Sequence, residues 1–299
     1  MDWIHRVDAI RQWAQNGNRA PHKPLLLLFA LGRFQSDGGA PIRFDQARAE
    51  LDRLLVEFGP PNPTSAGYPF HHLAGDGVWE VSTREGPGSP GSNVGALTRL
   101  EAAGRLAPEF SAALQSDSPL LAQVARLLLD KNFPASLHAD ICAAVGLDLE
   151  VAETDTAVRT AKAERVRGAQ FRKDVLLAYE YQCAFCGYDG LLAGAPVGLD
   201  AAHVRWWAFA GPDDVANGIC LCALHHKLFD KGVLGVATDH RIMVTAHFVG
   251  RSASAERQVL DLLDRPLRAP QGGFPVPDAE HLGWHRRQVL RAPVRQVRS

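Results

Sequence analysis

Residues 183–186 read Cys-Ala-Phe-Cys, and residues 222–225 read Cys-Ala-Leu-His. Each stretch places two metal-binding side chains three residues apart, so that both can face one ion from a tight turn. Together the two pairs offer three thiolates and one imidazole, a tetrahedral donor set that suits Zn²⁺. We therefore predict a structural zinc site formed by Cys183, Cys186, Cys222 and His225, which joins two segments that have little core of their own.

The remaining cysteines are predicted to have no ligand role. The chain has five cysteines, and four of them lie between Cys183 and Cys222, a distribution typical of a metal site rather than of a disulfide framework. Cys220 alternates with Cys222 along an expected strand and is predicted to pack as a small hydrophobe. The alternative in which Cys220 replaces Cys222 stays open, although the Cys-x-x-His spacing favours Cys222. Cys142 is predicted to be packed in a helix of the other half.

Three further residues lie in and between the zinc-binding segments at a characteristic spacing. His203 lies on an expected strand over residues 197–204, Asn217 forms a turn with the glycine that follows it, and His226 begins a helix that reaches residue 230. In this order the residues resemble the HNH nuclease family, which has the ββα-metal fold, over roughly residues 180–235. The resemblance implies that His203 is the general base that activates water and that His226 binds a catalytic divalent ion, Mg²⁺ or Mn²⁺. It also implies that Asn217 holds the loop and orients the strand of His203.

One position departs from the family pattern. Many members carry an acidic residue directly before the catalytic histidine, where this chain has Ala202. Asp200 is the nearest carboxylate and is the predicted second ligand of the catalytic ion; a phosphate oxygen and waters are the alternative. Because positions 200 and 203 face opposite sides of a regular strand, this prediction requires a bulge or bend. Asp230 is predicted to be a structural hydrogen-bond acceptor.

Two segments of the N-terminal half carry a second resemblance. Residues 19–28 read Arg-Ala-Pro-His-Lys-Pro-Leu-Leu-Leu-Leu, and residues 65–73 read Ser-Ala-Gly-Tyr-Pro-Phe-His-His-Leu. They resemble the sulfur-binding domain of McrA-type type IV restriction endonucleases, over roughly residues 1–150, which implies that this half recognises a phosphorothioate in the DNA backbone. Sulfur is less strongly hydrated than the oxygen it replaces, so an apolar dent favours it. The predicted contacts to the sulfur and its phosphate are Arg19, Pro21, His22, Lys23, Ser65, Tyr68, Pro69, His71, His72 and Arg84.

The sequence predicts an α+β chain of two domains. Residues 1–150 form the sulfur-binding domain, which is mainly helical and has a loop-rich segment over residues 59–90, where Pro and Gly leave room for loops and short strands only. Its helices are expected over residues 3–16, 45–58, 118–132 and 135–145 and along the apolar run that follows Pro24. Residues 151–166 are a linker or linker helix. Residues 167–299 form the zinc-containing HNH endonuclease domain, with helices at 167–180, 253–264 and 279–291 and two short strands within 233–246.

Charge and hydropathy narrow the possible partners. The formal net charge of −1 divides into −4 for residues 1–150 and +3 for the rest, so that the C-terminal half suits a polyanion, although so small a charge is weak evidence. There is no signal-peptide core and no run of 18 apolar residues, so we expect a cytoplasmic protein with no membrane partner. The expected partner is double-stranded DNA. Because a double-strand cut is most simply made by two active sites, we also expect a homodimer, with the helices over residues 253–291 as contacts.

Taken together, these features predict a type IV restriction endonuclease that recognises phosphorothioate-modified DNA and cuts nearby. Two alternatives stay open: an HNH nuclease that reads another mark, such as a methylated base, and a zinc module that binds DNA without cutting it. A reader of methylated bases needs an aromatic cage for a flipped base, and the aromatic residues of the N-terminal half are too scattered to decide. A pure binding module has no need of His203, Asn217 and His226 together.

Overall fold

The computed structural model describes residues 2–12, 20–149 and 160–296. The chain divides into two compact units, Met1–Ala157 and Val158–Ser299. Each unit buries an apolar core of its own. Among the described residues, no helix has both the length and the apolar character that crossing a membrane requires.

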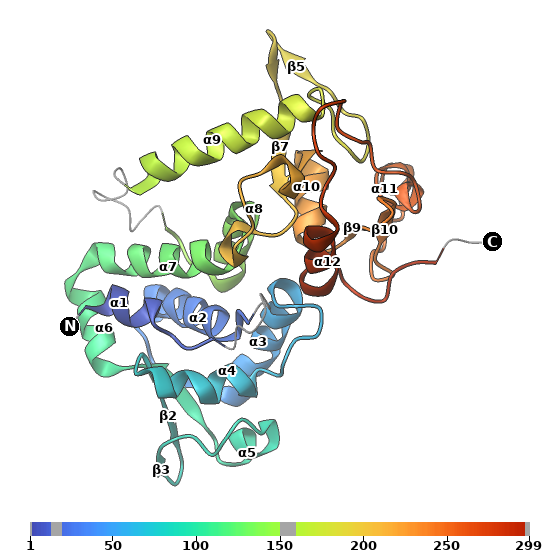
Figure 1. Cartoon of the computed structure of the whole chain (residues 1–299). Helices are drawn as coiled ribbons and strands as arrows, with labels where there is room; N and C mark the ends of the chain where they lie inside the picture. The colour runs from blue at the N-terminus through green and yellow to red at the C-terminus, as the bar shows by residue number, and fades with distance from the viewer. Residues whose placement is uncertain (1, 13–19, 150–159, 297–299) are drawn as a thin grey trace. The chain divides into compact units, whose positions relative to one another are not determined.

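The first unit is built around helix α2 (His22–Asp37), which carries the apolar run 25–31 (Figure 1). Every side chain of that run is buried, because α2 is covered on several sides by other helices of the unit. Pro24 lies in the first helical turn, where its missing N–H costs no hydrogen bond. Gly38, with a φ of 75°, ends the helix in the left-handed conformation that favours glycine. The helices that pack on α2 are α3 (Phe44–Phe58), α4 (Gly67–His72), α7 (Ser118–Asn132) and α8 (Ala135–Val145).

A small antiparallel sheet completes the first unit. Its strand order is β1-β4-β2-β3, formed by β1 (Ile42–Arg43), β4 (Ala103–Leu106), β2 (Trp79–Thr83) and β3 (Gly86–Pro87). The Trp79 indole Nε1–H donates to the Phe70 carbonyl at 3.1 Å and so ties the sheet to α4. Gly104 lies against the Trp79 ring, where a Cβ atom would overlap it.

The helices over residues 45–58, 118–132 and 135–145 are confirmed, but two predictions for the first unit are wrong. The expected helix over residues 3–16 ends early, as α1 (Trp3–Asp8), because the backbone N–H of Arg11 donates to the Asp76 carboxylate instead of continuing the helix. Residues 13–16 lie outside the described residues. The segment 59–90 holds more than loops and strands, since it forms α4 and the 3₁₀ turn η1 (Leu73–Asp76). Pro69 is tolerated in the first turn of α4, where N–H groups have no partner within the helix. The other helices of the unit are α5 (Val94–Arg99) and α6 (Pro108–Ser116).

The second unit contains a ββα element at its centre. Strands β7 (Leu199–His203) and β8 (Gly218–Cys222) pair antiparallel, and α10 (Ala223–Asp230) follows directly. Helix α9 (Thr160–Ala178) packs against both strands (Figure 1). The loop between the strands contains the 3₁₀ turns η2 (Trp207–Phe209) and η3 (Val215–Asn217).

The remaining elements surround this centre. Two strands within residues 233–246 are confirmed as the antiparallel pair β9 (Leu234–Val236) and β10 (Ile242–Val244). The helix expected over residues 253–264 is broken into α11 (Ala253–Gln258) and η4 (Leu260–Leu262), and the last helix is α12 (Ala279–Gln288). A hairpin of β5 (Leu191–Leu192) and β6 (Ala195–Pro196) completes the unit. Helix α9 begins inside the predicted linker segment 151–166, before the helix expected at residue 167. Residues 151–159 of that segment lie outside the described residues.

Candidate active site and metal centre

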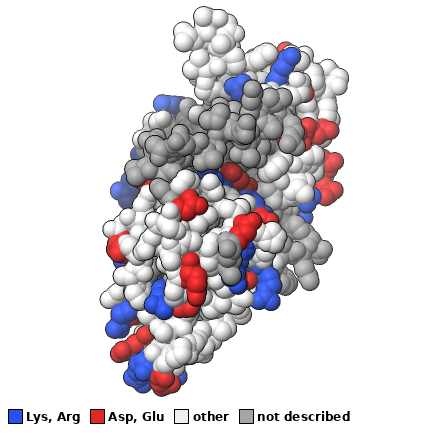
Figure 2. Space-filling model, turned by 90° about the vertical axis from the view of Figure 1, so that its left-hand side faces the viewer, with Lys and Arg blue, Asp and Glu red and all other residues white. Residues whose placement is uncertain are grey.

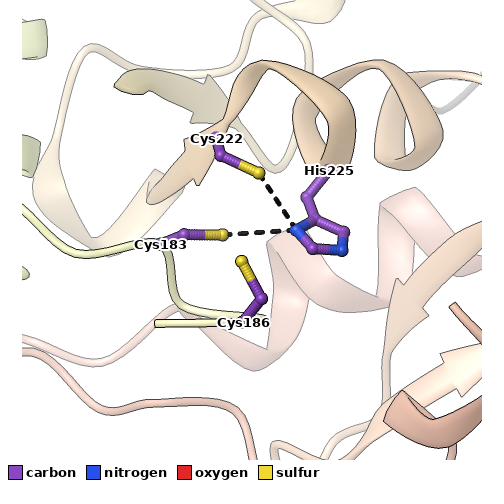
Figure 3. Close-up of side chains that lie close together, drawn as sticks. All are labelled: Cys183, Cys186, Cys222 and His225. Carbon is purple, nitrogen blue, oxygen red and sulfur yellow. Dashed lines mark hydrogen bonds between the residues drawn. The ribbon is translucent and has the colours of Figure 1, made fainter. Parts of the chain in front are cut away.

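Four side chains of the second unit converge on one point (Figure 3). One ligand atom from each of Cys183, Cys186, Cys222 and His225 lies within 4.8 Å of all the others. The first two come from the turn after α9, and the other two from the end of β8 and the start of α10. The Ala184 backbone N–H donates to the Cys220 carbonyl at 2.8 Å, which holds the two segments side by side.

The orientation of His225 fits a metal ligand. Its Nε2 lies 2.8 Å from the Gln258 carbonyl oxygen, to which it donates its proton, so that Nδ1 is left facing the sulfurs. Nδ1 lies 3.1 Å from Cys222 Sγ and 3.5 Å from Cys183 Sγ. Burial alone lowers the pKa of His225, but the hydrogen bonds with Cys183 and Cys222 raise it to about 10. Three thiolates and one imidazole at this spacing form a tetrahedral donor set, which suits zinc.

The two other cysteines lie outside this cluster. Cys220 is fully buried on β8, and burial raises its pKa to about 12, which keeps the thiol neutral. Cys142 lies on α8 of the first unit, where burial raises its pKa.

His203 lies at the end of β7 with its ring held from two directions. Phe171 of α9 stacks on the imidazole with ring centroids 4.0 Å apart and an angle of 14° between the planes. The imidazole Nε2 lies 2.8 Å from Oδ1 of Asp213. Burial lowers the pKa of His203, and the Asp213 carboxylate opposes this change only in part. The pKa of His203 is therefore lower than that of a histidine in water, which favours the neutral imidazole.

Asn217 is fully buried at the turn before β8, and its carboxamide clasps the loop that joins the two strands. Its Nδ2 donates to the carbonyl oxygens of Arg205 and Pro212, at 3.0 Å and 2.9 Å. Its Oδ1 accepts the Arg205 backbone N–H at 2.8 Å. These bonds close the loop onto itself directly after His203.

His226 lies between two carboxylates. Its Nδ1 is 3.7 Å from Oδ2 of Asp200 on β7, and its Nε2 is 3.2 Å from Oδ2 of Asp230, one turn later on α10. The Asp200 side chain is 52% exposed, whereas that of Asp230 is 1% exposed. Burial lowers the pKa of His226, but Asp230 and Asp200 outweigh it and raise the pKa overall.

Asp200 reaches His226 without any irregularity of the strand. The pairs from Leu199 with Cys222 to His203 with Gly218 form a continuous ladder, so the bulge required by the strand pattern is absent from the β7–β8 pairing. Arg172 of α9 fixes the carboxylate, with Nε 3.0 Å from Oδ1 of Asp200, and also donates to the Leu199 carbonyl at 2.7 Å.

The predicted sulfur-binding residues of α2 and α4 lie together in the first unit. Tyr68 is flanked by His22, with ring centroids 5.8 Å apart, and by His72, at 4.4 Å. His71 lies next to His72 and hydrogen-bonds Oγ of Ser89 through Nδ1 at 2.8 Å. Pro21 and Pro69 are buried at the starts of their helices.

The remaining predicted contacts to the phosphorothioate differ in their exposure. Lys23 is only 12% exposed, and its ammonium lies 2.6 Å from the Asp76 carboxylate. Ser65 is exposed just before α4, and Arg84 is exposed in the turn between β2 and β3. Arg19 lies outside the described residues.

Several side chains that contact the site carry no signal of their own in the sequence. Asp213 belongs to an irregular loop, and Phe171 and Arg172 belong to a helix whose site-facing side could not be assigned before β7 was placed. Asp76 and Ser89 of the first unit were not predicted either, because their hydrogen-bond partners lie 53 and 18 residues away in the chain.

The comparisons with known proteins agree with the division into two units. A family model described as a ScoMcrA-like DNA sulfur-binding domain matches residues 1–150, which is half of the chain. The chain belongs to this family. A second family model, for an HNH endonuclease, matches residues 183–237. That range includes the cysteine and histidine cluster, β7, β8 and α10, so the ScoMcrA-like chain also carries an HNH endonuclease domain.

Three solved structures match parts of this ScoMcrA-like chain. The sulfur-binding domain of ScoMcrA complexed with phosphorothioated DNA is 23% identical, with a TM-score of 0.43, and the match covers 51% of this chain and 99% of that one. The sulfur-binding domain of SprMcrA complexed with phosphorothioated DNA is 19% identical, with a TM-score of 0.44, and covers 50% and 94%. The type IV phosphorothioation-dependent restriction endonuclease ScoMcrA is 14% identical, with a TM-score of 0.39, and covers 76% and 94%. A search of curated proteins found no match.

Proposed function

We propose that this chain is a type IV restriction endonuclease that recognises phosphorothioate-modified double-stranded DNA and hydrolyses a phosphodiester bond nearby. One observation carries the proposal: a domain of the DNA sulfur-binding family and an HNH endonuclease domain occur in a single chain. A domain that binds modified DNA gives the nuclease its target, since hydrolysis itself needs only a phosphodiester.

We assign recognition of the sulfur to the ring cluster of the first unit, which is formed by His22, Tyr68, His71 and His72. The partly exposed Tyr68, next to the buried Pro69, offers apolar surface at the start of α4, and sulfur enters such surroundings at a lower desolvation cost than oxygen does. His22 and His72, whose ring centroids lie 5.8 Å and 4.4 Å from that of Tyr68, supply N–H groups for the remaining phosphate oxygens. Lys23 follows His22 in the chain. Because its ammonium is already paired with Asp76, we assign it an indirect part in phosphate binding.

His203 is the proposed general base. Its neutral imidazole takes a proton from the water that attacks the phosphorus atom, and the lowered pKa keeps that base available near neutral pH. Asn217 closes the loop that follows His203 and so fixes the end of β7.

His226 and Asp200 are the proposed ligands of a catalytic Mg²⁺ or Mn²⁺. A bound divalent ion stabilises the charge that develops on the scissile phosphate. The two nitrogens of His226 point to different carboxylates, so one ion can be shared with Asp200 or with Asp230 but not with both. The half-exposed Asp200 is accessible to DNA, whereas the buried Asp230 is suited to accept the Nε2 proton and orient the ring.

The cluster of Cys183, Cys186, Cys222 and His225 is the proposed structural Zn²⁺ site. Its four protein ligands fill a tetrahedron and leave no position for substrate, as in structural rather than catalytic zinc sites. We further propose that the protein acts as a homodimer, because a double-strand cut is most simply made by two active sites, each with its own His203.

The test compares three DNA duplexes of one sequence that carry a phosphorothioate, 5-methylcytosine or no modification, each with Mg²⁺ or Mn²⁺. We expect cutting of the phosphorothioate duplex alone, loss of cutting in His203→Ala with binding retained, and loss of the binding preference for the phosphorothioate duplex in Tyr68→Ala. Equal cutting of all three duplexes would exclude sulfur recognition, and cutting of the methylated duplex alone would establish a reader of methylated bases. Tight binding without any cutting would establish a DNA-binding zinc module. Sedimentation of the protein with the phosphorothioate duplex would test the homodimer.

A further inference from the structure

We propose that Asp213 is a positioning residue: its carboxylate holds the imidazole proton of His203 on Nε2 and so leaves Nδ1 as the nitrogen that accepts a proton from water. The inference rests on the proposed role of His203 as the base. It adds a residue outside the histidine and asparagine motif to the nuclease site.

The contact itself determines where the proton lies. Asp213 Oδ1 is 2.8 Å from His203 Nε2, and an ionised carboxylate only accepts hydrogen bonds. Nε2 must therefore carry the proton, and a neutral imidazole carries no second one. The His203 side chain is 23% exposed and that of Asp213 is 33% exposed.

A second constraint fixes the plane of the ring. Phe171 of α9 stacks on His203 almost parallel, at 14°, with ring centroids 4.0 Å apart. Stacking alone would allow the imidazole to turn over, which exchanges the positions of Nδ1 and Cδ2 and those of Nε2 and Cε1. The carboxylate at Nε2 removes that freedom, so the two contacts together specify both the plane and the orientation of Nδ1.

The loop that carries Asp213 is held on both sides of this residue. Asn217 bonds the Pro212 carbonyl directly before it, and the Asp214 carboxylate directly after it accepts the Ala216 N–H at 2.8 Å as the cap of η3. Gly211 packs so closely on the Arg205 carbonyl that a Cβ atom would overlap it. The buried Asn217 therefore acts on His203 through this loop as well as through the strand.

The first test reads the tautomer directly and does not depend on nuclease activity. Nitrogen-15 NMR of the full-length protein distinguishes the two imidazole tautomers, and the His203 signals are those missing from His203→Asn. In the wild-type protein we expect the proton on Nε2. In Asp213→Asn, whose carboxamide both donates and accepts, we expect the Nδ1-protonated form to appear. Protonation of Nδ1 in the wild-type protein overturns the inference even if no variant folds.

The second test measures cutting of phosphorothioate DNA. We expect Asp213→Asn to lower kcat by about 100-fold or more with KM within about twofold, because the base is disabled while DNA binding is intact. The concentration of Mg²⁺ needed for half-maximal rate should stay within about twofold of the wild-type value. If Asp213 were a ligand of the ion, its replacement would raise that concentration. Asp239→Asn, an exposed aspartate in the turn between β9 and β10, is the matched control and should cut like the wild type.

The outcomes separate this inference from the proposed function. A wild-type protein that cuts no DNA contradicts the nuclease, while the tautomer still decides the role of Asp213. Wild-type kcat in Asp213→Asn, or an unchanged His203 tautomer in that variant, overturns the positioning role and leaves the nuclease intact.

Discussion

His203 shows how burial and a neighbouring carboxylate act in opposite directions on one side chain. Burial and the nearby His226 lower its pKa, whereas Asp213 and Asp230 raise it, and the lowering effects prevail. The proposed base therefore holds its neutral form at pH values where a histidine in water is half protonated. A cation bound nearby would lower the pKa further, in the same direction.

This balance predicts the pH dependence of cutting. The base acts only when neutral, and its neutral form is lost as pH falls through its pKa, which lies below 6.5. We expect kcat/KM at pH 6.5 to remain above half of its plateau and to fall only at lower pH. Rates measured from pH 5 to 8 in buffers of equal ionic strength provide the check, and an acid limb centred above pH 6.5 would contradict the assignment of His203.

At the residue scale, most of what could be predicted came from the spacing of residues along the chain. Cys183, Cys186, Cys222 and His225 come together because each pair lies on one short turn, a local property that sequence reveals. Asp213 could not be predicted, because it comes from an irregular loop and its bond to His203 depends on tertiary contacts made by Asn217. The approach of Asp200 to His226 was expected, but the bulge invoked for it was not needed.

At the scale of elements, the metal cluster joins the turn after α9 to the β8–α10 junction (Figure 3). We expect Cys186→Ser to lose the zinc, about one ion per chain, and to destabilise the second unit strongly, since structural zinc sites contribute about 10 kcal/mol or more. Metal analysis and thermal unfolding would measure both effects.

Cys220→Ala is the matched control for that variant. Cys220 is as buried as a ligand cysteine but lies outside the cluster, so its loss should cost about 1 kcal/mol and leave the zinc in place. Zinc loss in Cys220→Ala with retention in Cys222→Ala would reverse the ligand assignment.

The loop between β7 and β8 gives a second prediction for an element. In Gly211→Ala the new methyl group would overlap the Arg205 carbonyl and press on Asn217 Nδ2, 2.9 Å away, so the loop must shift. We expect a loss of about 100-fold in cutting rate with the zinc retained, because a displacement near 1 Å in a catalytic group has that effect. Gly272→Ala, at a position with open space around it, should match the wild type. Equal rates for both variants would show that the loop has no part in catalysis.

Elements with strong apolar periodicity were predictable, and those shaped by tertiary contacts were not. Helices α7 and α8 match their predicted ranges, since each has a buried face and a proline at or next to its start. Helix α1 ends early because Asp76, far along the chain, captures the Arg11 N–H. Helix α4 was hidden by Gly67 and Pro69, which in an isolated sequence indicate a turn.

At the scale of the whole molecule, charge is distributed without a dominant sign. Residues 1–150 carry −4 and the rest +3. On the face drawn in Figure 2, Lys and Arg side chains are interspersed with Asp and Glu over the described residues. Even Lys23, next to the ring cluster, is neutralised by Asp76. We therefore expect the proposed preference for phosphorothioate DNA to come from local apolar contact more than from charge.

Salt dependence tests this reasoning on the whole protein. Contacts to ordinary phosphates are the same in modified and unmodified DNA, and they release counterions when DNA binds. We therefore expect the affinities of His203→Ala for the two duplexes to fall in parallel as salt rises from about 50 to 300 mM, at a constant preference for the phosphorothioate. Tyr68→Ala should abolish the preference and keep the slope, because it removes apolar surface and no charge. If His203→Ala, which keeps Tyr68, lost its preference for the phosphorothioate duplex at high salt, sulfur would be distinguished by charge and not by the Tyr68 surface.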